Sequence, residues 1–284
     1  MLMDPIEQVS ELCFELSNPD RLRIMQVIKD APMKLTDISE SIDVTHQQCL
    51  RHLKRLVDVL LVERNPDGLY ELSSFGELIL QLIPSLIFVS QHNEYFSTHS
   101  VSHLPSEFVA RIGDLSESIL LTNVMEALSE IESIVKTADE YIKVIINKRT
   151  HSLRPHIADA VRRGVLVKSL SVTSYVPNID VKREINKKDE HDIIDAEKEG
   201  RVMVADQTEF PVYIYMSEKT VFLALPLHDD SFDYTGFFSS SPNAVRFCNN
   251  IFEYYWKRTH IIPVPELIDR HNHYIEHYGI KPRK

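Results

Sequence analysis

Glycine is scarce in this chain, with seven residues among 284, whereas an average protein contains about 7% glycine. Neither GxGxxG nor GxxxxGK[ST] occurs anywhere in the sequence. These are the two glycine-rich loops that bring backbone amides close to the phosphates of a nucleotide. The composition therefore excludes the protein classes that hold a nucleotide through such loops, and no cofactor is predicted.

Cysteine is also rare, and Cys13, Cys49 and Cys248 are too far apart to form a CxxC pair. Isolated cysteines make no disulfide framework, which is typical of a reducing compartment. The longest apolar run, residues 78–89, is interrupted by polar residues and proline and is shorter than the ~20 residues of a membrane span. The first residues lack the pattern of a signal peptide. We therefore expect a cytoplasmic protein with no membrane partner.

Basic residues are outnumbered, with 31 Lys and Arg against 42 Asp and Glu, giving a net charge of −11. Such a chain repels nucleic acid on average. The local distribution differs from this average, because residues 44–57 contain Arg51, Lys54 and Arg55 and no acid. One short segment can therefore attract an anionic partner despite the total charge.

The hydrophobic periodicity divides the first part of the chain into a small domain and a linker. Residues 1–76 show short helical patterns followed by a strand, an Asn-Pro-Asp-Gly turn and a second strand, which predicts a β-hairpin. Residues 77–138 continue as helical patterns. The segment 75–96 is too apolar to stand alone in water, so we expect it to pack on the next domain or on its copy in a dimer.

The remaining residues, 139–284, alternate between strand and helix patterns. Strand 141–146, helix 152–163 and strand 165–172 predict a parallel βαβ unit. Residues 180–199, which are mostly charged, are expected to form a solvated loop and helix. The predicted fold is thus α+β and α/β: an N-terminal winged helix-turn-helix, a helical linker, and a C-terminal α/β domain with a mixed sheet.

The helical pattern over residues 45–57 is the main functional feature. Steps of 100° per residue predict a core side with Cys49, Leu50, Leu53 and Leu56 or Val57. They predict an exposed side with Gln48, Arg51, His52 and Arg55, and Thr45 at the N-terminal end. A basic helix face alone is usually just solvated, but the preceding short helix and turn give the layout of a helix-turn-helix whose second helix enters the major groove.

The candidate DNA-binding residues divide by chemistry into those that read bases and those that hold phosphates. The base-edge candidates are Gln48, Arg51 and His52. The phosphate candidates are Thr45, Lys54, Arg55 and, in the wing, Arg64. The set is completed by Gln47 on the helix and Asn65 beside the wing tip.

Residues 13–76 resemble archaeal winged-helix transcription regulators of the arsenical-repressor-like type. The similarity lies in SNPDRLRIMQVI, in LTDISESIDVTHQQCLRHLKRL and in LVERNPDGLYELSSFGELI. Leu60 departs from the pattern, which often has glycine there. Residues 104–113 (LPSEFVARIG), 213–226 (YIYMSEKTVFLALP) and 252–256 (FEYYW) are similar to the methanogenesis-regulator family. The resemblance implies a dimeric regulator that binds a pseudo-palindromic operator and carries a C-terminal sensory domain.

Basic and polar residues follow the first strand of the predicted sensor domain, where parallel sheets bind ligands. They are Lys148, Arg149, His151, Ser152 and Arg154. We expect them to hold a small anionic effector, although a solvated basic loop is the simpler alternative.

The histidine pairs His99/His103 and His273/His277 are each spaced i, i+4, as metal ligands on one helix face are. No third ligand or thiolate accompanies either pair, so no metal is predicted, and a metal-sensing repressor stays an alternative. Sensor domains of related regulators can resemble phospholipase D, but residues 139–284 contain no HxK, and the chain has no GxSxG or HExxH. We expect no enzymatic activity. A winged-helix module for protein contacts is the other alternative.

Overall fold

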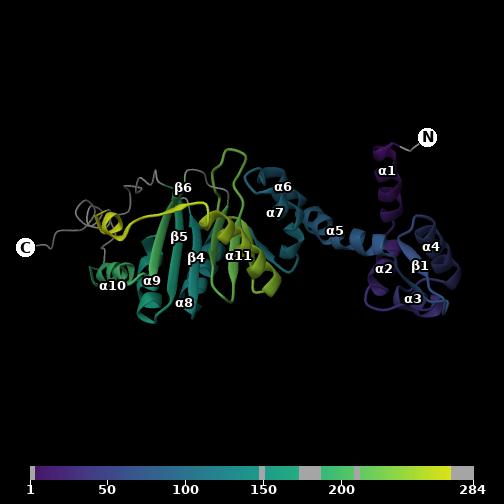
Figure 1. Cartoon of the computed structure of the whole chain (residues 1–284), viewed down its shortest axis with the longest axis horizontal. Helices are drawn as coiled ribbons and strands as arrows, with labels where there is room; N and C mark the ends of the chain where they lie inside the picture. Colours follow the sequence, from purple (N-terminus) through teal and green to yellow (C-terminus); the bar gives the residue numbers. More distant parts are fainter. Residues whose placement is uncertain (1–3, 147–150, 173–186, 208–211, 270–284) are drawn as a thin grey trace, which may run out of the picture. The chain divides into compact units, whose positions relative to one another are not determined.

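The computed structural model describes residues 4–146, 151–172, 187–207 and 212–269 (Figure 1). It divides into two compact units, Met1–Leu86 and Ile87–Lys284. The boundary falls inside helix α5 (Ser74–Gln91). Residues 87–138, the larger part of the linker expected over residues 77–138, thus belong to the same unit as the C-terminal sheet.

The first unit contains the helices and the hairpin that the periodicity predicts. In chain order the elements are α1 (Pro5–Leu16), α2 (Pro19–Val27), α3 (Leu35–Ser41), α4 (His46–Asp58), β1 (Val62–Arg64), β2 (Tyr70–Leu72) and the start of α5. Asp4 and Asn18 cap α1 and α2 through side-chain oxygens that accept backbone N–H groups, as N-cap residues commonly do. Polar residues just before each apolar stripe therefore fix where these helices begin.

The core of the first unit is built from α2, α3, α4 and β1. Its fully buried side chains are Ile24, Met25, Ile38, Cys49, Leu53, Leu56 and Leu61. Helix α1 contributes little, since Leu12 and Leu16 are only partly buried against this core. The three helices that build the helix-turn-helix are thus fixed by apolar packing, whereas α1 is not.

The hairpin is the wing of the helix-turn-helix. Strands β1 and β2 pair antiparallel, with Arg64 opposite Tyr70 and Glu63 opposite Glu71. Tyr70 also exchanges two backbone hydrogen bonds with Met33, at 2.9 and 2.8 Å. Gly68 has φ +82° in the turn, a conformation that glycine adopts without steric cost. The wing is therefore anchored to the segment that precedes α3.

The connection between α4 and the wing contains a strained residue. Leu60, which stands where related sequences often have glycine, has φ +61°. The left-handed conformation costs an L-residue roughly 1–2 kcal/mol. Leu60 is also largely exposed, so burial of its side chain offsets little of this cost. The presence of leucine instead of glycine at position 60 therefore preserves the turn but strains its backbone.

The second unit is an eight-stranded mixed sheet covered by helices. Its strand order is β10-β6-β5-β4-β7-β8-β9-β3, with β4, β5 and β6 parallel and the remaining pairs antiparallel. The strands are β3 (Ile119–Leu121), β4 (Tyr141–Ile146), β5 (Leu166–Val172), β6 (Val202–Gln207), β7 (Tyr213–Met216), β8 (Val221–Ala224), β9 (Gly236–Ser239) and β10 (His260–Ile261). The helices are α6 (Asn93–Thr98), α7 (Ser106–Ala110), η1 (Ile112–Leu115), α8 (Val124–Thr137), η2 (His151–Leu153), α9 (Arg154–Arg162), α10 (Lys187–Lys198) and α11 (Pro242–Trp256).

Each face of this sheet has its own core. Helix α11 covers one face with Phe247, Ile251 and Phe252, while α8 and α9 cover the other with Ile131, Ile134 and Val161. The sequence correctly predicted the βαβ unit and the mixed sheet. The expectation of helical patterns throughout residues 77–138 was wrong at one place, because Ile119–Leu121 form an edge strand paired with β9.

Helix α5 exposes much of its apolar surface. Leu78, Leu82 and Leu86 are 55%, 51% and 64% exposed. Their i, i+4, i+8 spacing places them on one helix face. Among the described residues, α5 is the single helix whose length and apolar composition would suffice to cross a membrane. Gly76 is required near its start, because a Cβ there would lie 1.9 Å from the carbonyl oxygen of Leu61.

Candidate nucleic-acid interface

Helix α4 begins with a capping box formed by Thr45 and Gln48. The Thr45 Oγ1 atom accepts a hydrogen bond from the backbone N–H of Gln48 at 3.3 Å, and Gln48 Oε1 accepts one from the N–H of Thr45 at 3.1 Å. This reciprocal arrangement satisfies N–H groups that an uncapped helix would leave without partners. Both residues, predicted to contact DNA, therefore first define where the helix starts.

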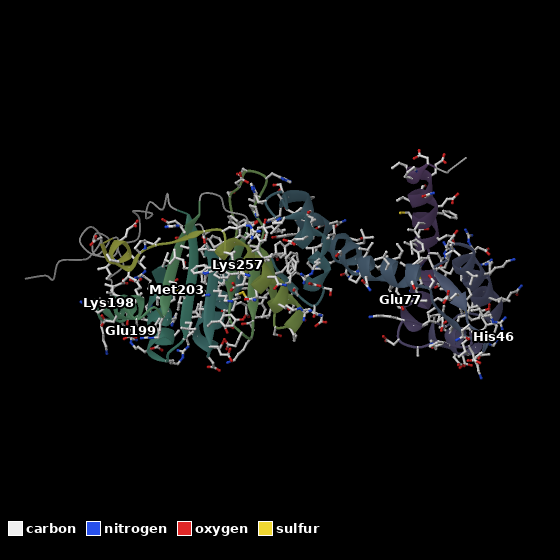
Figure 2. The ribbon with its side chains drawn as sticks, viewed as in Figure 1. His46, Glu77, Lys198, Glu199, Met203 and Lys257 are labelled. Atoms are coloured by element: carbon white, nitrogen blue, oxygen red, sulfur yellow. The ribbon has the colours of Figure 1, made fainter. Side chains whose placement is uncertain are left out.

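The exposed face of α4 is a polar and basic stripe. It consists of His46, Gln47, Leu50, Arg51 and Lys54, and we call it the α4 stripe. Figure 2 shows the side chains of this unit, with His46 labelled. Arg51 and Lys54 make no ion pair or hydrogen bond with another described residue. Their positive charges are therefore available to an external anion.

Two residues of α4 lie on the opposite side from the one expected. Leu50 was assigned to the core but is 49% exposed, and His52 was assigned to the exposed face but is 7% exposed. The core-facing side is centred on Cys49, Leu53 and Leu56, so positions 50 and 52 flank it on either side. Packing against α2 covers position 52 and leaves position 50 open. His52 is therefore placed wrongly for a base contact.

The environment of His52 disfavours protonation of its imidazole. Burial lowers the pKa of His52, and although Asp20 acts in the opposite direction, burial prevails. The Nε2 atom lies 3.9 Å from Asp20 Oδ2, and Nδ1 has no hydrogen-bond partner among the described residues. The HxK tripeptide of this chain, His52-Leu53-Lys54, thus has a buried histidine and offers no accessible nucleophile.

Arg55, a predicted phosphate contact, is bound within the protein. Its Nε and Nη2 atoms donate to the two carboxylate oxygens of Glu15 in α1, at 3.0 and 2.5 Å. Its guanidinium also lies over the ring of Phe14, 5.2 Å from the centroid. Unlike Arg51 and Lys54, Arg55 is therefore not free to meet a phosphate.

The wing contributes one of its two predicted residues to the surface. Arg64 is exposed, and its Nε donates to the carbonyl of Gly68 at 3.0 Å. Asn65 instead organises the turn, since its Oδ1 accepts from the N–H groups of Asp67 and Leu69 at 3.1 and 3.0 Å. Its Nδ2 donates to Glu71 at 3.3 Å. Asn65 thus shapes the wing from within.

A groove of about 440 Å³ lies between α4, the start of α3 and the wing. Leu50 and Tyr70 line its apolar part, Lys34 and Arg64 supply two cations, and Asp67 supplies one carboxylate. The acids Glu63 and Glu71 face each other in the wing register one residue away from Arg64 and Tyr70, which places them on the other side of the hairpin. The lining of the groove therefore carries two cations and one acid, and its net charge is positive.

Sequence reasoning missed His46, Lys34 and the exposure of Leu50. His46 is the first residue of α4, and the N-terminal residues of a recognition helix are those that contact base edges. This position alone would have placed His46 among the candidate DNA-binding residues. Lys34 gave no comparable signal, because its place beside the groove depends on the pairing of Met33 with Tyr70.

The predicted effector site is only partly described. Lys148 and Arg149 lie outside the described residues, as does the side chain of His151. Ser152 is exposed. Arg154 makes a bidentate ion pair with Glu190 of α10, a residue that is 1% exposed. The buried carboxylate of Glu190 thus already neutralises Arg154, the residue that was expected to hold an anion.

Helix α10 also corrects the expectation of a solvated segment for residues 187–199, whereas residues 180–186 lie outside the described residues. Asp189, Glu190 and Glu197 are buried, and Arg162 of α9 pairs with Asp189 and Asp192. Acids that look like a solvated run in sequence therefore face basic residues of a neighbouring helix. Between these helices and the sheet lies a cavity of about 70 Å³. Its walls are mainly aliphatic, and Arg154, Ser169 and Glu197 border it.

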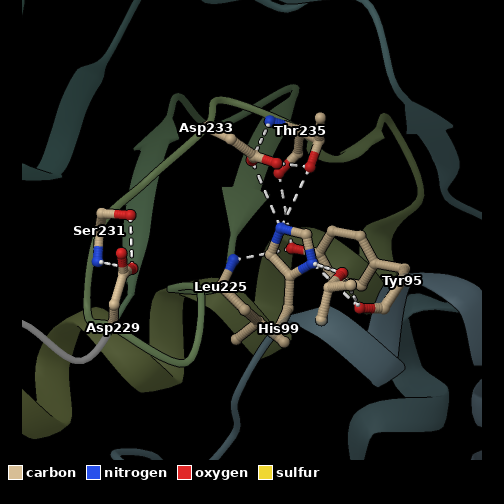
Figure 3. Close-up of polar contacts among 8 residues, drawn as sticks. Tyr95, His99, Leu225, Asp229, Ser231, Asp233 and Thr235 are labelled. Carbon is tan, nitrogen blue, oxygen red and sulfur yellow. Dashed lines mark hydrogen bonds and ion pairs between the residues drawn. The ribbon is translucent and has the colours of Figure 1, made fainter.

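The imidazoles of His99 and His103 do not form a common metal site, because each contacts a different aspartate. His99 is buried and stacked on Tyr95, with ring centroids 3.8 Å apart, and its Nε2 lies 3.3 Å from Asp233 Oδ1 (Figure 3). His103 Nε2 bonds to Asp230 at 2.8 Å. Within the described ranges no group of three or more His, Cys, Asp or Glu residues is placed to hold a metal ion. His273 and His277 lie outside those ranges.

The first unit is a winged helix-turn-helix domain of the DNA-binding type. Its defining features are the packed helices α2, α3 and α4, the exposed α4 stripe and the two-stranded wing. Residues 16–65 match the family model described as a helix-turn-helix domain. A DNA-binding domain fused to an α/β unit is consistent with a transcription regulator or a chromatin protein. None of the curated proteins matches the chain.

Several solved structures are similar at low identity. TrmBL2, described as an archaeal chromatin protein, is 15% identical, with 90% of this chain and 99% of that chain covered and a TM-score of 0.40. The winged helix-turn-helix domain of Mb0332 from Mycobacterium bovis is 17% identical over 31% and 85% of the two chains, with a TM-score of 0.28. Nuc of Salmonella typhimurium, a phospholipase D family member, is 12% identical over 48% and 90%, with a TM-score of 0.34. Such distant likenesses carry no information about function.

Proposed function

We propose that this protein is a cytoplasmic transcription regulator that binds a specific DNA sequence through α4 and the wing, and that it has no catalytic role. The observation that carries the proposal is the α4 stripe. In a chain of net charge −11, it presents Arg51 and Lys54 without acidic partners among the described residues. Recognition of the major groove requires an exposed basic face, without neutralising acids, on the second helix of a helix-turn-helix.

The proposed contacts follow from the position of each side chain along the stripe. Gln47 and Arg51 carry the donors and acceptors that read base edges, and Leu50 offers an apolar contact for the methyl group of thymine. Lys54 and Arg64 act on phosphates, joined by Lys34 on the far side of the groove. Phosphate contacts set the register on the duplex, and base contacts supply the specificity.

We further propose that the protein acts as a homodimer joined along α5. Leu78, Leu82 and Leu86 form an exposed apolar row, and fully burying a leucine side chain contributes ~1.5–3 kcal/mol. A two-fold partner would cover the same row on both copies and place two recognition helices on a pseudo-palindromic operator. Sedimentation velocity should show a dimer that Leu82→Lys dissociates. Flotation of the wild-type protein with lipid vesicles would instead favour a membrane as the partner of α5.

The second unit is proposed to sense a small molecule. Its support is the 70 Å³ cavity between the sheet and α9 and α10. An anionic effector held by Arg154 has less support than the sequence suggested, because Glu190 already neutralises that guanidinium. A panel of metabolites followed by thermal shift tests the sensing role. Unchanged melting with anionic and neutral members alike would contradict it.

Genome-wide capture tests the DNA-binding proposal directly. Sheared genomic DNA is incubated with the full-length protein, the retained fragments are sequenced, and the enriched sequence is measured by mobility shift. We expect one enriched motif, and loss of the enrichment in the Arg51→Ala/Lys54→Ala double variant. A folded protein that enriches no DNA would favour the protein-interaction alternative, and a stoichiometric transition metal in untagged protein would favour the metal sensor.

A further inference from the structure

Helix α1 contacts the rest of the first unit mainly through a buried charged residue. Its one buried residue is a charged one, Glu15, while Ile6, Val9 and Phe14 are exposed large apolar residues. Leu12 and Leu16 pack against the core only partly. The position of α1 therefore depends strongly on what the Glu15 carboxylate binds.

Two arginines from different helices meet on that carboxylate. Arg55 of α4 donates to both oxygens, at 3.0 and 2.5 Å, and Arg21 of α2 lies 3.3 Å from Glu15 Oε2. Arg21 also donates to the backbone carbonyls of Glu15 and Phe14 at 2.5 and 2.9 Å. Arg21 would thus keep partners in α1 if Arg55 left, whereas Arg55 has its described ion pair with Glu15 alone.

The side chain of Arg55 is half open to solvent. It is 42% exposed, compared with 9% for Glu15 and 6% for Arg21. Arg55 follows Arg51 by one helical turn, so it flanks the α4 stripe. A phosphate beside the helix could therefore compete for this guanidinium, because bidentate pairing serves carboxylate and phosphate equally well.

We infer that Glu15 is a positioning residue that withholds Arg55 from the DNA backbone. The interface then makes one phosphate contact fewer than the basic residues of α4 provide for, and binding to unrelated sequences is correspondingly weaker. Because the Glu15 carboxylate lies in the last turn of α1, any partner or movement that displaces α1 releases Arg55. This inference rests on the proposed DNA-binding function.

Salt dependence distinguishes this role from a merely structural one. The full-length wild type and the variants Glu15→Gln, Arg55→Ala and Glu15→Gln/Arg55→Ala are titrated with a random-sequence duplex at several salt concentrations. We expect Glu15→Gln to steepen the slope of log K against log salt by about 0.9, which corresponds to roughly fivefold to tenfold tighter binding at 0.1 M salt. Adding Arg55→Ala to that variant should cancel the gain.

Glu11→Gln is the matched control. Glu11 is exposed on the same helix and makes no ion pair with another described residue, so the variant changes the net charge equally without touching Arg55. We expect its salt slope to equal that of the wild type. An equal steepening in Glu11→Gln would overturn the inference, because total charge would then explain the effect.

The wild-type background gives a test that does not require Glu15→Gln to fold. Arg55→Ala should leave the salt slope of random-duplex binding unchanged, because the native Arg55 makes no phosphate contact. A slope reduced by about 0.9 would show that Arg55 already contacts DNA and would overturn the inference alone. If the folded wild type binds no duplex at any salt concentration, the proposed function fails and takes the inference with it.

Discussion

Two basic segments of this protein look alike in sequence and differ in the structure. Residues 51–55 in α4 and residues 154–163 in and just after α9 each contain three basic residues within a short stretch. In α4, Arg51 and Lys54 have no acidic partner among the described residues. In α9, buried or half-buried acids of α10 neutralise Arg154 and Arg162.

The difference teaches that local basic charge does not establish an anion site. Glu190 lies 36 residues beyond Arg154 in the chain, so no local window reveals the pair. The mean charge of a segment predicts attraction only where the fold leaves that charge uncompensated. By this criterion α4 meets the requirement for the proposed interface, whereas the basic residues of α9 are paired within the second unit.

The largest expected effect is on stability in the second unit. Arg154→Ala leaves the Glu190 carboxylate, at 1% exposure, without its guanidinium partner, and breaking a buried pair in this way costs about 3–5 kcal/mol. Chemical denaturation followed by circular dichroism measures the loss. The exposed pair of Lys198 and Asp195 supplies the control, since Lys198→Ala should cost no more than about 1 kcal/mol. A loss below that level for Arg154→Ala as well would remove the contrast between the two segments.

In α4 the expected effect is on DNA binding, with stability unchanged. Arg51→Ala should cost ~1–3 kcal/mol of binding to the enriched motif and relax its sequence preference, whereas Lys54→Ala should weaken all duplexes alike and reduce the salt slope by about 1. Mobility shifts on the motif and on a random duplex separate the two results. Equal losses on both duplexes for Arg51→Ala would contradict this division between base and phosphate contacts.

A smaller effect is expected from Leu50, the exposed apolar member of the α4 stripe. Leu50→Ala should cost about 1 kcal/mol of binding to the motif, if burial of one methyl group is worth ~0.8 kcal/mol and the contact is with thymine. Replacing thymine by deoxyuridine removes that methyl group from the DNA. The wild type should lose affinity for one such position, and Leu50→Ala should not. Identical losses in both proteins would exclude the contact.

The smallest effect concerns pH and the buried His52. Burial lowers the pKa of His52 in the folded state, whereas the unfolded chain takes up the proton at about pH 6.5. The unfolded state then binds more protons, so stability is full above about pH 6.5 and falls as the pH drops toward the folded pKa. His52→Gln should reduce the loss of melting temperature between pH 7.5 and pH 5.5.

Burial also lowers the pKa of His92, which acts in the same direction in the second unit. The variant should therefore keep part of the pH dependence. If the wild type and His52→Gln lost the same melting temperature over this range, His52 would not contribute to it.

The sequence was most informative where structure is set by local patterns. The run YIKVII predicted β4 with its observed bounds, Tyr141–Ile146, because its short length and its β-branched residues favour a buried strand over a helix. Thr45 located the start of α4, where it is the N-cap residue. Such features depend on neighbouring residues in the chain, so they can be read without knowing the fold.

The sequence predictions were wrong where residues distant in the chain determine the burial or the pairing of a side chain. Leucine at position 50 and histidine at position 52 lie on the two margins of the apolar face of α4, and composition places a leucine inside by default. Packing on α2 reversed both assignments. Likewise, no local pattern shows that Glu15 binds Arg55, 40 residues away, or that Ile119–Leu121 pair with β9.

The capping box of α4 places two demands on a single side chain. Position 48 must accept the N–H of Thr45, as Gln48 Oε1 does, and glutamate is the other residue that commonly does so. A glutamate there would put a negative charge beside the phosphates of a bound duplex, whereas glutamine completes the cap without charge. Exchange of Gln48 for glutamate would therefore be tolerated by the fold and, under the proposed function, would weaken DNA binding.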